Sequence, residues 1–264
     1  MRIRDLIKQL RQILWILKER GGWKHLVIHK TSITEGLPHS VSIPLLCRPV
    51  KNSLSKPTNL SIVLIHDYPK KPLAEKALDY VGIDDYIVLR PPGGELKCGS
   101  HKIRIMHDYL KNDCETDYVI YIDSSDAIII NPMEHIIEYL TNCQCDLLFS
   151  TTQFTGGYSW MPELKKWSDE VAAASGTNGI YINSGVYVGK RSFLLNVLEA
   201  CLPYITDKDL PWGTYRPRWH DPSLKDELPE FPKGMGSDQL LFRYVHKKFY
   251  PGMKIDYEGL LALR

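Results

Sequence analysis

Asp123 and Asp126 are two carboxylates that follow directly on the apolar run 118–122. A short run of β-branched and aromatic residues is typical of a buried strand in an α/β sheet. Both acids would then lie just beyond the carboxyl end of the strand, where open α/β sheets bind their ligands. Because successive side chains of a strand point to opposite faces, the chain must turn at Ser124 and Ser125 before both acids can serve one site.

Two oxygen ligands at this spacing suit Mg²⁺ or Mn²⁺, and such an ion can in turn bind the diphosphate of a substrate. The alternative is that Asp123 and Asp126 cap the next helix or form a turn, as aspartate often does. The acid motif by itself favours neither interpretation over the other, so the remaining motifs must decide between them.

Asn183, Ser184 and Gly185 interrupt a second apolar stretch, residues 179–189, which is predicted to be a strand. A glycine inside a strand pattern marks a bulge or a close approach of two backbones, and the neighbouring Asn and Ser offer hydrogen bonds there. These residues are candidates for a binding site, and a plain bulge without a ligand is the alternative.

Two further candidates are a lysine and a tryptophan. Lys102 lies near the start of a predicted helix and is a candidate phosphate contact, although such residues more often form a solvated helix face. Trp160 lies in the loop 156–162, where it could stack on a sugar ring or fill the core. The long loop 203–236 carries aromatic residues and no periodicity, which favours a lid or an acceptor-binding loop.

The elements that must position these residues alternate along the chain. Apolar runs predict strands at 60–67, 86–89, 118–122, 146–150 and 254–257. Helical periodicity and helix-start signals predict helices at 72–81, 101–110 and 191–200, one beginning at Pro132 and one beginning near Ser237. This alternation predicts an α/β fold with a mostly parallel sheet flanked by helices.

The composition excludes several classes of protein. The chain has 264 residues and a formal net charge of +2, too balanced for nucleic-acid binding. No apolar run approaches the roughly 18 residues that span a membrane, and the N-terminus has no secretory signal pattern. The six cysteines form no CxxC pair, which argues against a zinc site and favours reduced thiols. A cytoplasmic location is therefore expected.

The first twenty residues form a separate feature. Residues 2–19 combine apolar side chains at helical spacing with several Lys and Arg residues. Such a basic helix could lie peripherally on the inner face of an anionic membrane, or it could pack on the protein itself or on a second subunit, which is slightly favoured. The chain is thus divided into a basic amphipathic helix at 1–22, a connector at 23–59 and a main domain at 60–264.

Together these motifs resemble the GT-A fold, nucleotide-sugar-dependent glycosyltransferases. The resemblance is to the glycosyltransferase domain of procollagen lysyl hydroxylases and collagen glucosyltransferases, and more distantly to glycogenin-like transferases. It extends from about Gly93 to Leu260 and rests on the order of Lys102, Asp123-Ser-Ser-Asp126, Leu147-Leu148-Phe149-Ser150, Asn183-Ser184-Gly185 and Asp238-Gln239-Leu240. It implies a Rossmann-like GT-A domain with an N-terminal helical extension.

The resemblance also implies a role for each matching residue. Asp123 and Asp126 would bind Mn²⁺ or Mg²⁺, which bridges the diphosphate of a UDP-sugar. Asp238 and Asn183 would be the catalytic residues, and related enzymes mostly retain the anomeric configuration. The donor would further contact Lys102, Ser184, Gly185, Gln239 and Trp160.

Three departures from the family pattern weaken these assignments. Ser124 and Ser125 stand where related domains carry an aromatic residue between the metal-binding acids. Ser237 replaces one of two paired acids. The chain also ends at Arg264 without the downstream metal-binding histidine, and His246 is expected to be a surface residue of a helix.

Three functions remain open. The first is a metal-dependent hexosyltransferase that uses a UDP-sugar and a glycan or protein acceptor, for example in polysaccharide biosynthesis. The second is a non-catalytic GT-A relative that binds a nucleotide or glycan as a scaffold. The third is a nucleotidyltransferase, which is less favoured because residues 66–69 do not supply a glycine-rich basic loop after the first strand.

Overall fold

The computed structural model of the protein describes residues 54–127, 129, 133–211, 230, 232–259 and 261, apart from the side chain of Ser159. All of these residues belong to one compact unit. The predicted basic helix, most of the predicted connector and much of the loop 203–236 lie outside them. The predicted division into a basic helix, a connector and a main domain stays a prediction.

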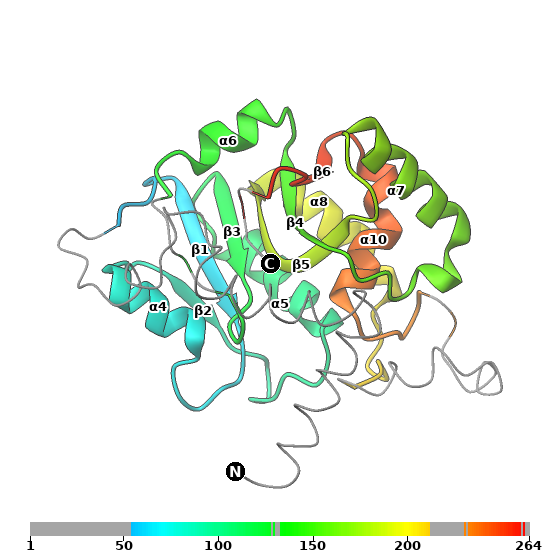
Figure 1. Ribbon diagram of the computed structural model, residues 1–264. Coiled ribbons are helices and arrows are strands. Elements are labelled where there is room, and N and C mark those ends of the chain that lie inside the picture. Colours follow the sequence, from blue (N-terminus) through cyan, green and yellow to red (C-terminus); the bar gives the residue numbers. More distant parts are fainter. Residues whose placement is uncertain are drawn as a thin grey trace, which may run out of the picture. The chain divides into compact units, whose positions relative to one another are not determined.

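The centre of the molecule is a mixed sheet of six strands in the order β2-β1-β3-β5-β4-β6 (Figure 1). Strand β5 is antiparallel to both neighbours, and the other pairings are parallel. This arrangement confirms the predicted α/β class with a mostly parallel sheet. The strands are β1 Leu60–Ile65, β2 Ile87–Leu89, β3 Tyr118–Ile122, β4 Leu147–Thr152, β5 Tyr181–Lys190 and β6 Met253–Ile255.

Helices flank the sheet at α4 Leu73–Val81, α5 Ser100–Asn112, α6 Ile136–Asn142, α7 Pro162–Ala174, α8 Arg191–Cys201 and α10 Asp238–Phe249, with short 3₁₀ turns η1 Tyr158–Trp160 and η2 Leu202–Tyr204. Most lie where the periodicity predicts them, whereas α7 was not predicted. The helix predicted from Pro132 begins at Ile136, because Met133 N and the Glu134 carboxylate instead hydrogen-bond to Ser55.

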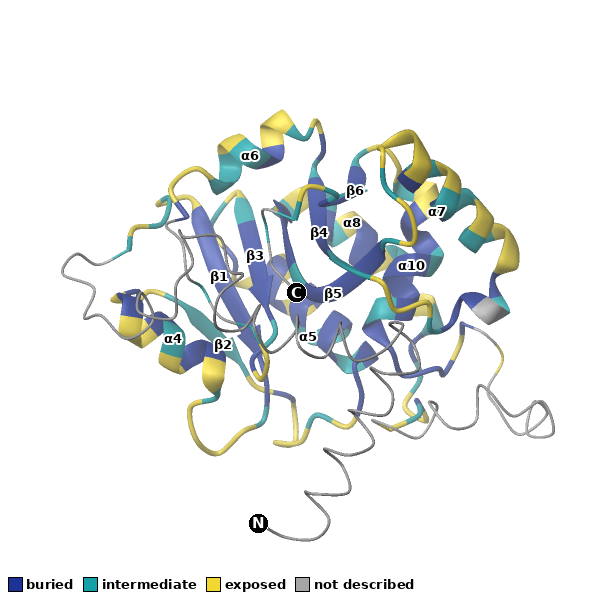
Figure 2. Cartoon of the chain, in the orientation of Figure 1, coloured by how far each residue is buried: buried dark blue, intermediate teal, exposed yellow. Residues whose placement is uncertain are grey.

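Both faces of the sheet are buried, which explains why its strands are almost continuously apolar (Figure 2). Along β1, Val63 and Ile65 pack with residues of α5, α8 and α10 in one core cluster. Ile62 and Leu64 point the other way and pack with residues of α4 and α6. This alternation follows from the two-residue period of a strand.

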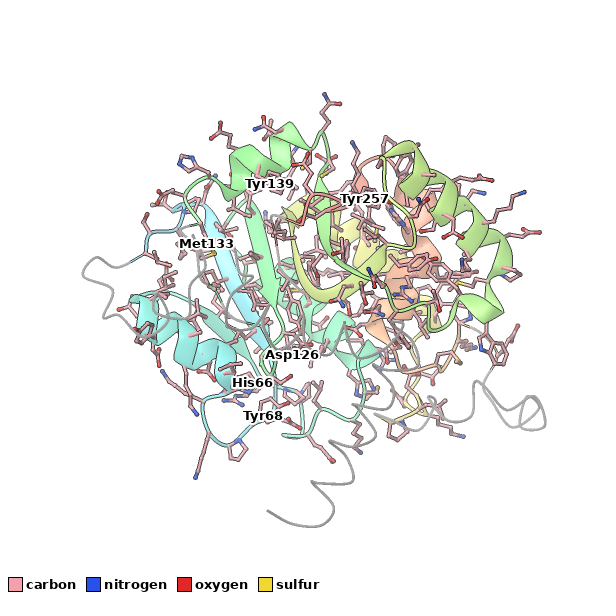
Figure 3. The ribbon with its side chains drawn as sticks, viewed as in Figure 1. His66, Tyr68, Asp126, Met133, Tyr139 and Tyr257 are labelled. Atoms are coloured by element: carbon pink, nitrogen blue, oxygen red, sulfur yellow. The ribbon has the colours of Figure 1, made fainter. Side chains whose placement is uncertain are left out.

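The carboxyl ends of β1 and β3 lie at the same edge of the sheet because the two strands are parallel. Figure 3 shows His66, Tyr68 and Asp126 at this edge and Tyr139 at the opposite one. The amino-terminal half of β5 continues past the end of β3, since the pairing of these two strands stops at Ile122 and Val186. The residue directly after β3, Asp123, therefore contacts this part of β5, where its backbone N–H donates to the Gly185 carbonyl.

The predicted bulge in the second apolar stretch is confirmed. Phe149 of β4 pairs with Tyr187, but the next residue, Ser150, pairs with Asn183. Three residues of β5, from Ser184 to Val186, therefore oppose no residue of β4.

Two simpler expectations concern the thiols and the membrane. Five cysteines lie in the described part of the chain, at 98, 114, 143, 145 and 201, and all are free thiols, as expected. None of the described helices is long and apolar enough to cross a membrane.

Candidate functional site

Lys102 and Asp123 form an ion pair at the edge of the sheet. Lys102 is in the first turn of α5, and Asp123 is the residue directly after β3. Lys102 Nζ lies 2.9 Å from Asp123 Oδ1, with side-chain exposures of 10% and 28%. Lys102 is therefore not part of a solvated helix face, whereas Arg104 pairs with the exposed Asp207.

The Asp123 carboxylate is held from several sides. Its Oδ1 also accepts the Tyr121 hydroxyl at 3.3 Å and the Ser124 backbone N–H at 3.2 Å. Its own backbone N–H donates to the Gly185 carbonyl at 2.7 Å. The orientation of this carboxylate is thus fixed before any ligand arrives, as a binding site requires.

Asp238 is a second carboxylate in the same cluster. It is the first residue of α10 and is 7% exposed, and the nearby Ser184 side chain favours its charged form. Burial raises the pKa of Asp238, and nearby Lys102 opposes the shift. Burial alone would lower the pKa of Lys102, but Tyr121, Asp123 and Asp238 together raise it well above its usual value. Lys102 is therefore paired with Asp123 and is also influenced by the charge of Asp238.

The bulge of β5 connects these groups. Ser184 N–H donates to Gln239 Oε1 at 3.4 Å, which ties the bulge to the first turn of α10. Gly185 N–H donates to the Asn183 side-chain oxygen at 2.7 Å, and the Ser150 hydroxyl donates to the Asn183 carbonyl at 3.2 Å. Asn183 is only 2% exposed, and these bonds shape the bulge. Its catalytic role stays a prediction.

The two remaining predicted site residues are Asp126 and Trp160. Asp126 is exposed and is in the turn 124–126, which confirms that the chain turns directly after β3 (Figure 3). Trp160 is half-buried in η1. Among the described residues, no hydrogen bond, ion pair or ring contact joins Trp160 to Lys102, Asp123 or Asp238.

The acids offer the ligands that Mg²⁺ and Mn²⁺ prefer. Such ions are often bound by one or two carboxylates, with phosphate oxygens and water completing the shell. Within the described ranges, no third His, Cys, Asp or Glu joins Asp123 and Asp126 in a metal-binding group. The described residues therefore do not form a complete protein shell for an ion around Asp123 and Asp126, and the metal site stays a prediction.

The prediction that His246 is a surface residue is wrong. His246 is 1% exposed and lies on the face of α10 that packs against Trp167, with the two ring centroids 5.0 Å apart. Its Nε2 is 3.2 Å from the Met253 carbonyl oxygen and donates to it. Burial lowers the pKa of His246 to about 4, so the ring is a neutral part of the core.

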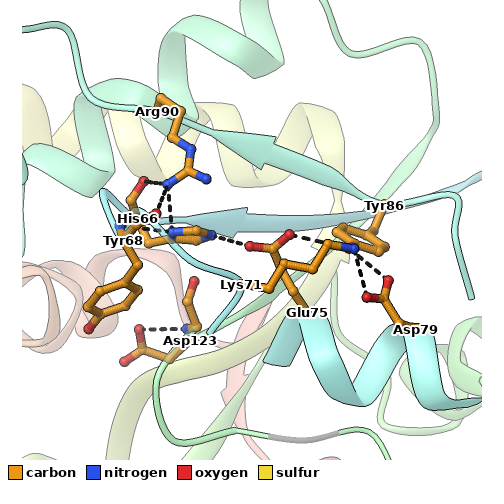
Figure 4. A network of polar contacts seen from close by, with 9 residues as sticks. His66, Tyr68, Lys71, Glu75, Asp79, Tyr86, Arg90 and Asp123 are labelled. Carbon is orange, nitrogen blue, oxygen red and sulfur yellow. Dashed lines mark hydrogen bonds and ion pairs between the residues drawn. The ribbon is translucent and has the colours of Figure 1, made fainter. Parts of the chain in front are cut away.

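Sequence reasoning missed a buried polar network behind the end of β1 (Figure 4). His66 Nε2 is 2.9 Å from Glu75 Oε1. His66 Nδ1 is 2.9 Å from Arg90 Nη1 and 3.2 Å from Tyr68 N. Because both of these groups are donors, Nδ1 is the acceptor and His66 is neutral with its proton on Nε2. Burial and the Arg90 charge lower the pKa of His66 accordingly.

This network positions the exposed ring of Tyr68. Arg90 Nη1 also donates to the Tyr68 carbonyl at 2.8 Å, and the Tyr68 ring stacks on His66 with centroids 5.4 Å apart. The Tyr68 side chain is nevertheless 43% exposed. Polar and aromatic residues directly after a strong strand were the only sequence signal for this feature.

Neither the family models nor the curated proteins compared with this chain give a match. The fold and the geometry of the site therefore carry the functional conclusion. Both place a buried lysine, the oriented carboxylate of Asp123 and an exposed aromatic ring around the carboxyl ends of β1 and β3.

Proposed function

We propose that the protein is a GT-A-type glycosyltransferase that moves a hexose from a UDP-sugar to a glycan or protein acceptor. The observation that supports this most is the ion pair of Lys102 with Asp123, near the buried Asp238, at the ligand-binding edge of an α/β sheet. A nucleotide-sugar site needs cationic groups for the diphosphate and a carboxylate for the sugar, and this cluster supplies both.

In this proposal each group has a separate task. Asp123 and Asp126 hold Mn²⁺ or Mg²⁺, which when bound neutralises charge on the departing UDP. Lys102 adds a fixed positive charge next to the diphosphate, where a preorganised cation favours the charged leaving group. Asp238 and Ser184 line the position of the hexose, and we propose transfer with retention of configuration.

The nucleotide side of the site is proposed at the end of β1. Aromatic rings with an exposed face bind nucleobases by stacking. Tyr68 offers such a face, and the contacts of His66 and Arg90 fix its backbone before a ligand binds. The donor would then extend from Tyr68, past Asp123, to Asp238.

The test is hydrolysis of UDP-glucose, UDP-galactose and related donors in the presence of Mn²⁺, which needs no acceptor. We expect the wild type to hydrolyse one donor, and we expect chelator or Asp126→Ala to abolish that activity. Asp126 is exposed, so its replacement should leave the fold intact. Asp84→Ala changes another exposed aspartate and should keep full activity. Loss of activity in both variants would contradict the proposed metal site.

A non-catalytic, nucleotide-binding relative is the second candidate. The observation that favours it is that Lys102 already neutralises Asp123, while the described residues offer no third metal ligand. UDP binding measured by calorimetry, without hydrolysis or transfer to any acceptor, would support this candidate. If UDP with Mn²⁺ does not bind at all, the donor site is wrong for both candidates.

The cellular setting is part of the proposal. We propose a cytoplasmic enzyme whose residues 1–20 can contact the inner membrane surface. Liposome sedimentation of the full chain and of a variant lacking residues 1–22 tests this contact. Equal partitioning of the two proteins would remove it.

A further inference from the structure

Two segments that precede α10 lie side by side. Leu210 N–H donates to the Gly234 carbonyl at 3.0 Å, and Gly234 N–H donates to the Tyr204 carbonyl at 3.0 Å. Gly236 has a φ of +67°, and a side chain there would collide with the Leu210 carbonyl oxygen. The segment 204–210 is therefore in direct backbone contact with the residues that lead into α10.

Asp209 is the buried anchor of this contact. Its Oδ1 accepts the Thr206 backbone N–H and the Thr206 hydroxyl, each at 2.7 Å, and its Oδ2 accepts the Ser100 hydroxyl. Asp209 is 8% exposed, and no Lys or Arg of the described residues pairs with it. A buried carboxylate with only neutral donors is costly, so its presence points to a geometric role.

The Ser100 hydroxyl, which donates to Asp209, belongs to the helix that carries Lys102. Ser100 is the first residue of α5, two positions before Lys102. Ser100 N–H donates to the Gly236 carbonyl at 3.2 Å, and Gly236 lies two positions before Asp238. Asp209 is therefore hydrogen-bonded directly to Ser100 at the start of α5. Ser100 in turn connects it to Gly236, which lies just before the start of α10.

We infer that Asp209 is a positioning residue, which fixes the amino terminus of α5 against that of α10 and thereby sets the spacing between Lys102 and Asp238. This inference rests on the proposed function for its effect on the donor. The spacing matters because Lys102 Nζ pairs with Asp123 Oδ1 at 2.9 Å, and a shift of either helix terminus changes the position of Asp238 relative to that pair.

The experiment measures how fast an amine-acylating reagent labels Lys102 in the full-length protein, with mass spectrometry as the readout. We expect the reagent to label Lys102 at least about tenfold faster in Asp209→Ala, and in the milder Ser100→Ala, than in the wild type. The reason is that each variant removes hydrogen bonds to a charged group. Lys56 is the internal control, since its side chain is 12% exposed and ion-paired but lies outside this network.

Asp207→Ala is the matched control variant. Asp207 lies in the same segment and also contacts α5, but its side chain is 95% exposed and pairs with Arg104. It should leave Lys102 labelling unchanged. If Lys102 labelling is also unchanged in folded Ser100→Ala and Asp209→Ala, or if Lys56 labelling rises equally, the positioning role is overturned.

A kinetic arm separates this inference from the proposed function. With the donor that the wild type hydrolyses, Ser100→Ala should raise KM by about fivefold, whereas Asp207→Ala should leave KM unchanged. If the wild type neither hydrolyses nor binds any UDP-sugar, the proposed function fails. The labelling result still decides whether Asp209 positions Lys102.

Discussion

Lys102 Nζ lies 2.9 Å from Asp123 Oδ1, and its side chain is 10% exposed. Asp238 is close enough to contribute to the raised pKa of Lys102. The ammonium group is thus the ion-pair partner of Asp123, and it also favours the charged form of the buried Asp238. The stability of the protein and the charge of its candidate site depend on the same residue.

Lys102→Met is expected to lower the free energy of unfolding by about 3 kcal/mol, because it leaves two carboxylates without their cation. Urea denaturation followed by circular dichroism measures the loss. Lys165→Met is the control, since the exposures of Lys165 and Asp169 are 38% and 40% and such a pair contributes about 0.5 kcal/mol. Equal losses in the two variants would show that Lys102 has no special electrostatic role.

Because His246 is buried in its neutral form, we expect the protein to lose stability in mild acid. Burial lowers its pKa from 6.5 to about 4, so the unfolded chain takes up the proton first as the pH falls. The stability that the neutral His246 ring contributes to the folded protein is fully present above pH 6.5 and is lost between pH 6.5 and about 4. It amounts to about 3 kcal/mol at most, since one pKa unit corresponds to about 1.4 kcal/mol.

Urea unfolding of the wild type and of His246→Gln across this pH range tests the contribution. The variant should show a flatter pH dependence than the wild type. His135→Gln is the control because the His135 side chain is 79% exposed, and it should keep the wild-type dependence. A His246→Gln curve parallel to that of the wild type would contradict the assignment.

Arg243 is expected to stabilise the loop before η1. Its buried guanidinium group donates to the carbonyl oxygens of Gly156 and Phe154 at 2.7 Å and of Ile182 at 3.0 Å. Arg243→Met removes the donors of these hydrogen bonds and should cost about 3 kcal/mol.

Thermal unfolding measures this cost, and limited proteolysis should show faster cleavage at residues 153–157. Lys71→Met removes a cation whose side chain is 53% exposed, and it should leave the midpoint of thermal unfolding close to that of the wild type. Unchanged proteolysis in folded Arg243→Met would mean that other contacts hold the loop.

Tyr68→Ala is expected to weaken UDP binding by about tenfold, because stacking of a base on an aromatic ring contributes about 1–3 kcal/mol. Isothermal titration calorimetry with UDP and Mn²⁺ provides the measurement. Tyr80→Ala is the matched control, since Tyr80 is 45% exposed on α4 and Tyr68 is 43% exposed. If both variants bind UDP as the wild type does, the base lies elsewhere.

Local patterns in the sequence predicted most of the secondary structure. The apolar run 118–122 became β3, the turn followed it as expected, and the glycine in the second stretch marked a bulge. These features depend on residues close together in the chain, where side-chain period and backbone preference act directly. The start of α6 was misplaced because it involves a contact of Glu134 with Ser55, which lies 79 residues away and is invisible to a local pattern.

The tertiary structure alone decided which side chains meet. The sequence by itself left Lys102 between a phosphate contact and a solvated helix face, and the ion pair with Asp123 spans 21 residues. The partners of His66 lie in α4 and after β2, and Asp209 and Ser100 are 109 residues apart. Such contacts follow from the packing of whole helices on the sheet and from the direction of β5, which no local period encodes.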